Sequence, residues 1–122
     1  TGIANPDGSL GGPFDATLRS PGLASRLAGV SNYFRDGTAL PRRLNEFAIL
    51  VVARQWNSAF EWHAHCASAI EAGLDVQVAQ DLSNGKRPAA MKDDEALVYD
   101  AAMEGVDLFS LSKVTVGDRA LA

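Results

Sequence analysis

Apolar side chains recur along this chain with a helical period. Between positions 21 and 36 they fall every three or four residues, which predicts an amphipathic helix: Leu23, Leu27, Val30 and Phe34. Ser20 and Pro21 form a favourable start, because serine can accept hydrogen bonds from the first amides and proline fits the first helical position. Gly37 is the predicted end of this helix.

The same period predicts further helices over 42–56, 59–72, 76–82 and 93–104, and a last one from Thr115. Glycines mark three of their ends, because glycine readily adopts the left-handed conformation that follows a helix: Gly73, Gly85 and Gly105. The last helix is predicted from Thr115-x-x-Asp118, which resembles a capping box.

The fold class that follows is all-α, with five or six helices, because no strand-like alternation or hairpin dipeptide lies between two apolar runs. At 122 residues the chain is predicted to form one domain over 1–122, in which the Gly- and Pro-rich segment 1–13 is an extended arm. The chain starts at Thr1 and stops at Ala122 within a helical pattern, so we expect residues to be missing from one or both ends.

Composition and charge exclude several classes of partner. The net charge is -4 and the basic residues are scattered, which argues against nucleic acid and against an anionic membrane surface. No apolar run of 18 residues predicts a transmembrane helix, and no leader pattern is present. The single Cys66 cannot form an internal disulfide, which predicts a reducing, cytoplasmic setting.

The segment 42–73 holds most of the chemically reactive side chains: both histidines, the cysteine and both tryptophans. The predicted helix 42–56 has almost no polar face, so we expect it to be buried on most sides. Glu46 on that helix must then be paired or neutral. One interpretation is a structural ion pair with Arg54 or Arg42.

In the next predicted helix, Glu61, His65 and Ser68 share one stripe, whereas His63 points away from it. The two histidines therefore do not converge on a metal ion. Glu61 and His65 supply only two ligands, and a third would have to come from Glu46 or a neighbouring subunit. We expect no metal here.

Two structural alternatives stay open for these residues. Ser58-Ala59-Phe60-Glu61 matches a capping box, in which Glu61 only satisfies the first amides of the helix. His65 could be a hydrogen-bonded core histidine, and Cys66 a small buried apolar group. Against these alternatives, a carboxylate and an imidazole on adjacent helices suit proton transfer.

Several motifs in this region resemble the carboxymuconolactone decarboxylase family. They are EFAILVVAR at 46–54, FEWHAH at 60–65, and Ala69-x-x-x-Gly73-Leu74, and the resemblance extends over about residues 12–118. It implies an alkylhydroperoxidase-D-like helical bundle that assembles as homo-trimers or homo-hexamers, with sites near subunit contacts and no organic cofactor.

The peroxidase branch of the same superfamily uses a glutamate, a Cys-x-x-Cys pair and a histidine four residues further on. By that spacing, Glu46 and His65 match the glutamate and the histidine, whereas Ser58 and Glu61 stand where the two cysteines would be. Because the dithiol is absent, peroxide reduction through a disulfide is not the expected activity.

The resemblance implies a decarboxylase-like lyase that acts on a small carboxylated lactone or oxo-acid. In this interpretation His65 donates the proton, Glu61 orients it and Glu46 holds the relay. The alternatives are a peroxidase that uses Cys66 alone, and a non-catalytic oligomeric binding protein in which Glu61 only caps a helix.

Charge alone suggests which residues would hold the carboxylate of the substrate. Arg54 or Arg42 could clamp it, because a guanidinium binds a carboxylate through two hydrogen bonds. Trp62 and Ser58 are the other candidate substrate contacts.

Overall fold

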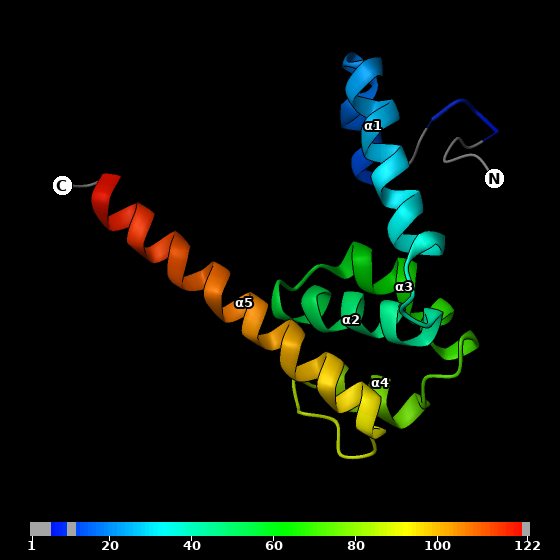
Figure 1. The fold of residues 1–122 in the computed structure, drawn as a ribbon, viewed down its shortest axis with the longest axis vertical. Coiled ribbons are helices and arrows are strands. Elements are labelled where there is room, and N and C mark those ends of the chain that lie inside the picture. Colours follow the sequence, from blue (N-terminus) through cyan, green and yellow to red (C-terminus); the bar gives the residue numbers. More distant parts are fainter. Residues whose placement is uncertain (1–5, 10–11, 121–122) are drawn as a thin grey trace. The chain divides into compact units, whose positions relative to one another are not determined.

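The computed structural model describes residues 6–9 and 12–120. Within these ranges the chain is all-helical and has no strand, which confirms the predicted class (Figure 1). The contacts divide it into two compact units, 1–39 and 40–122. The prediction of a single domain over the whole chain stays a prediction.

The first unit contains a 3-10 helix η1 (Gly12–Arg19), the helix α1 (Pro21–Asn32) and one π-helical turn η2 (Tyr33–Gly37). α1 begins at Pro21 as predicted, but the side chain of Ser20 makes no capping hydrogen bond. No residue of α1 is buried, and its apolar stripe is 40–53% exposed at Leu23, Leu27 and Val30. Among the described residues of this unit, no buried side chains form a core against α1.

The predicted N-terminal arm falls mostly outside the described residues. Its described part, 6–9, contains a turn in which Asp7 Oδ1 accepts hydrogen bonds from the Ser9 amide at 2.9 Å and the Ser9 hydroxyl at 2.7 Å. Regular structure begins at Gly12, which is one residue earlier than the predicted end of the arm.

The second unit is built around α2 (Arg42–Gln55), which packs against α3 (Ala59–Glu71), α4 (Val76–Ser83) and α5 (Asp93–Ala120). Apolar residues at helical spacing on these elements form its core: Phe47, Leu50, Val51, Ala69, Leu74, Val78, Ala79, Leu82 and Tyr99. The core therefore joins α2, α3, α4 and α5.

Local signals set the ends of these helices where the pattern predicts them. Ser58 and Asp75 cap α3 and α4, since their side chains accept hydrogen bonds from the amides of Glu61 and Gln77. Gly73 follows α3 with a φ of +102°, a conformation that glycine adopts without strain.

The C-terminal part of the chain differs from its prediction. α5 runs without interruption through Gly105 and Thr115, so the predicted helix end and the predicted second start are both wrong (Figure 1). The physical reason is that one exposed glycine costs a helix only about 1 kcal/mol relative to alanine. No proline lies between Gly105 and Ala120 to stop the helix.

A charge cluster joins α2 to the start of α5. Arg43 pairs with Asp94 and with Glu95, and Glu95 is only 1% exposed. The second Glu95 oxygen accepts a hydrogen bond from the Lys92 amide at 2.8 Å. The Arg43 guanidinium also holds the pKa of Asp94 below its ordinary value, chiefly through the hydrogen bond that it donates to the Asp94 carboxylate.

In the described part of the chain, no helix combines the length and the apolar character needed to cross a bilayer.

Candidate active site

α2 and α3 bring a buried glutamate against a histidine. Glu46 Oε2 lies 2.7 Å from His65 Nδ1, and Glu46 is 7% exposed. The pairing partner of Glu46 is therefore His65, and the ion pair with Arg54 or Arg42 that the sequence allowed is not formed.

The other ring nitrogen of the same histidine faces a second carboxylate. Glu61 lies one helical turn before His65, and its Oε2 is 3.5 Å from His65 Nε2. Since the Glu46 carboxylate accepts a hydrogen bond from Nδ1–H, a neutral imidazole presents the lone pair of Nε2 to Glu61. At 3.5 Å the two groups form an ion pair when the ring is protonated, and this contact must shorten for a proton to pass between them.

Glu61 forms only half of the capping box that its spacing allows. The Ser58 hydroxyl accepts a hydrogen bond from the Glu61 amide at 3.4 Å. The reciprocal contact is absent from this part of the structure, because the Ser58 amide donates instead to the Ala53 carbonyl at 2.8 Å. The Glu61 carboxylate is therefore directed to His65 and is not used as a cap.

This arrangement does not suit a metal ion. Glu46 and Glu61 lie on opposite nitrogens of one imidazole, so the three side chains cannot converge on one ion. Among the residues described, no group of three or more His, Cys, Asp or Glu side chains could hold a metal.

Beside Glu61 there is an apolar cavity of about 470 Å³. It is lined by Asn45, Ala48, Ile49, Val52, Ala53, Trp56, Ser58 and Glu61. Glu61 is the charged side chain among these lining residues. One carboxylate of the group Glu46, His65 and Glu61 therefore lies at the wall of an otherwise uncharged cavity.

The cavity also corrects the prediction that the helix 42–56 is buried on most sides. Val52 is 40% exposed and Trp56 is 43% exposed, because this face of α2 lines the cavity and does not join the core. The signal for this face was present in the sequence, since Asn45, Ile49, Val52 and Trp56 lie at the spacing of one helical stripe.

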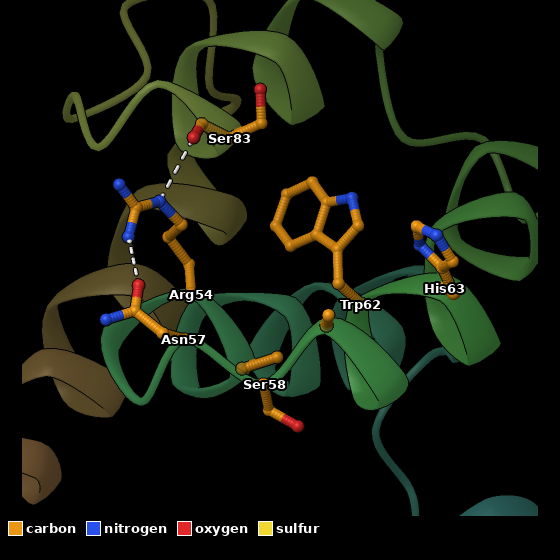
Figure 2. Close-up of a pocket in the computed structure, with 8 residues that line it drawn as sticks. Arg54, Asn57, Ser58, Trp62, His63 and Ser83 are labelled. Carbon is orange, nitrogen blue, oxygen red and sulfur yellow. Dashed lines mark hydrogen bonds between the residues drawn. The ribbon is translucent and has the colours of Figure 1, made fainter.

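The other predicted substrate contacts surround a different cavity, of about 310 Å³ (Figure 2). Arg54 and Trp62 line it together with His63, and Glu61 does not. Arg54 donates from Nε to the Ser83 carbonyl at 3.0 Å and from Nη1 to Asn57 Oδ1 at 2.9 Å. Arg54 thus ties the end of α2 to the last carbonyls of α4, where a cation is favourable.

Ser58 lines both cavities. Figure 2 shows the Ser58 hydroxyl on the side away from Arg54 and Trp62. Arg42 lines neither cavity and pairs with Glu71 at 3.7 Å on the exposed surface. The structure therefore brings together Glu46, His65 and Glu61, and separates both arginines from them.

The fold and the site define an all-helical protein with a histidine held between two carboxylates. Compared with family models, with curated proteins and with solved structures, the chain has no match. The family resemblance of the sequence stays a prediction, as does the alkylhydroperoxidase-D-like form of the bundle.

Proposed function

We propose that this chain is a cofactor-independent acid–base enzyme, a decarboxylase-like lyase on an alkylhydroperoxidase-D-like scaffold. The observation that carries the proposal is the imidazole of His65 between Glu46 and Glu61, with Glu61 at the wall of an apolar cavity. A positioned carboxylate and imidazole are the groups that general acid–base catalysis uses most often.

The proposed substrate is a small carboxylated lactone or oxo-acid. In the reaction the bond between the substrate carbon and its carboxylate breaks, both electrons remain on the carbon, and carbon dioxide leaves. A cavity without a cation in its lining favours this step, because it solvates an ionised carboxylate poorly. The proton carried by the Glu61–His65 pair is then added to the carbon, while Glu46 keeps the ring of His65 in position.

The oligomeric state and the location are part of the same proposal. The cavity face of α2 leaves Val52 and Trp56 partly exposed in the single chain. A homo-trimer or homo-hexamer, as the resemblance implies, would cover such a face. The single Cys66 suits a cytoplasmic setting.

The proposal is tested by measuring carbon dioxide release from a panel of carboxylated lactones and oxo-acids. His65→Ala and Glu61→Gln should each lower the rate by at least about 100-fold, which is the lower range for a general acid or base. Glu71→Gln, the same substitution near the other end of α3, should leave the rate unchanged. Full activity in both His65→Ala and Glu61→Gln would rule out this mechanism.

The peroxidase alternative depends on Cys66. This thiol is half-buried and packs against the core, and it is the single cysteine of the chain. Under this alternative Cys66→Ser would abolish peroxide consumption, whereas the acid–base proposal expects no effect of Cys66→Ser on decarboxylation.

A further inference from the structure

The cavity beside Glu61 offers no cation to a charged ligand. Its lining residues contribute one carboxylate, from Glu61, and otherwise only uncharged side chains. The two arginines on α2 that could have bound an anion lie elsewhere, since Arg54 is held by the Ser83 carbonyl and Arg42 pairs with Glu71. An uncharged ligand therefore loses no favourable interaction between a charge and water on entering this cavity.

The same wall contains a hydroxyl next to the carboxylate. The Ser58 hydroxyl accepts a hydrogen bond from the Glu61 amide, and its own O–H donates to no described acceptor. Ser58 and Glu61 both line this cavity. A base and a neutral hydrogen-bond donor thus lie one helical turn apart at the start of α3.

Proton transfer at a carbon next to a carbonyl needs these two groups. A base removes the proton from the carbon, and a donor stabilises the negative charge that develops on the carbonyl oxygen. The apolar lining residues around Glu61 and Ser58 strengthen both interactions once a ligand has displaced water from the cavity. Known isomerases move protons on neutral ketones with a carboxylate base and a hydrogen-bond donor at the carbonyl oxygen.

We propose that this site also catalyses double-bond isomerisation of small uncharged β,γ-unsaturated ketones. Glu61 takes a proton from the carbon between the carbonyl and the double bond, which leaves a dienolate whose oxygen accepts a hydrogen bond from Ser58. Glu61 then returns the proton to the γ-carbon, and the conjugated ketone forms. The reaction is balanced without an oxidant, a reductant or a second substrate.

His65 and Glu46 support this cycle without contacting the substrate. His65 Nε2 faces Glu61, and its Nδ1 is held by the buried Glu46. When His65 carries the proton of the Glu61–His65 pair, Glu61 is ionised and can act as the base. The inference uses the site of the proposed function, but it needs only the proton-transfer half of that reaction.

The test uses 3-cyclohexenone as the probe and follows the ultraviolet absorbance of the conjugated product. The wild-type chain should isomerise it faster than buffer does, and Glu61→Gln should lower the rate by at least about 100-fold. Glu71→Gln is the matched control on α3 and should retain the wild-type rate. A wild-type rate equal to that of Glu61→Gln would overturn the proposal.

The Ser58 role is tested by a pair of substitutions, one of which removes the hydroxyl and one of which retains it. Ser58→Ala removes both the hydroxyl and the helix cap and should lower kcat by at least about 10-fold, which corresponds to one lost hydrogen bond in the transition state. Ser58→Thr keeps the hydroxyl and should restore most of kcat. Equal kcat values for wild type and Ser58→Ala would contradict the assigned role of Ser58.

A carboxylated cyclohexenone separates this inference from the proposed function. If the uncharged ketone is turned over and no carboxylated compound loses carbon dioxide, the isomerase inference holds and the decarboxylase proposal fails. If only carboxylated compounds react, the inference fails and the decarboxylase proposal holds.

Discussion

The two carboxylates on either side of His65 differ in burial and in distance. Glu46 is almost fully buried and lies 2.7 Å from Nδ1, whereas the Glu61 side chain is 39% exposed and lies 3.5 Å from Nε2. A short contact with a buried group suits orientation of the ring. A longer contact with a group at a cavity wall suits proton exchange with a ligand.

A single-residue prediction concerns the charge cluster that joins α2 to α5. Arg43→Met leaves the Glu95 carboxylate buried without its cation, so the free energy of unfolding should fall by about 3–5 kcal/mol. The measurement is urea denaturation monitored by circular dichroism.

Arg42→Met is the matched control for that prediction. The Arg42–Glu71 pair is exposed and 3.7 Å long, so its loss should cost less than about 1 kcal/mol. Equal losses of stability in Arg43→Met and Arg42→Met would contradict the assigned role of the buried Glu95.

At the residue scale, the sequence predicted contacts within one helix better than contacts between helices. Glu61 and His65 share a stripe because helical geometry requires it, and the structure retains that stripe. Glu46 was assigned an arginine as a possible partner, but Arg54 lies about 80° away around the helix and reaches α4 instead. The buried Glu95 was missed, although it stands on the α5 stripe of Val98 and Ala102 that packs on the core.

At the scale of helices, Gly73 and Gly105 were both predicted to end a helix, but only Gly73 does so. Gly73 has a φ of +102° and ends α3, whereas Gly105 lies inside α5. A Cβ atom at Gly105 would meet nothing within 4 Å. A pattern alone does not separate these cases, because the cost of an internal glycine is small and neighbouring packing decides whether the helix continues.

Alanine substitutions at these two positions should therefore have opposite signs. Gly105→Ala should raise the free energy of unfolding by about 0.5–1 kcal/mol, because alanine restricts the unfolded chain and favours the helix. Gly73→Ala should lower it by about 1 kcal/mol or more, because alanine is strained at positive φ. Thermal melting monitored by circular dichroism gives both values, and a stabilising Gly73→Ala would contradict the helix end described here.

At the scale of the whole molecule, the two units differ in how much they bury. Among the residues whose burial the structure describes, the buried core side chains all lie at or after Leu44, in the unit 40–122. α1 has 12 residues and buries none of them. A helix of this length is marginal in water without tertiary packing.

Hydrogen exchange should reveal this difference in the isolated chain. The amides of α1 should show protection at least about 100-fold lower than those of Phe47 and Leu50 in α2, because local opening requires little free energy where few apolar contacts are broken. Mass spectrometry of peptic fragments or amide NMR measures the exchange. Comparable protection in both helices would show that α1 is covered by apolar contacts.

The class of the fold could be predicted from the sequence because helical periodicity is a local property of each segment. The division into two units depends on contacts between segments, and a periodic pattern does not report which apolar stripe meets which. The stripe of α1 and the core face of α2 look alike in the sequence, yet Leu23 is 50% exposed and Leu50 is fully buried.

The central claim is that Glu46 orients His65 so that Nε2 exchanges protons with Glu61. A long-range ¹H–¹⁵N correlation spectrum of the chain, recorded where the ring is neutral, reports which nitrogen of His65 carries the proton. We predict that the proton lies on Nδ1, where the Glu46 carboxylate accepts it, and that Nε2 has the chemical shift of an unprotonated nitrogen. A neutral His65 with its proton on Nε2 and a bare Nδ1 would contradict the account.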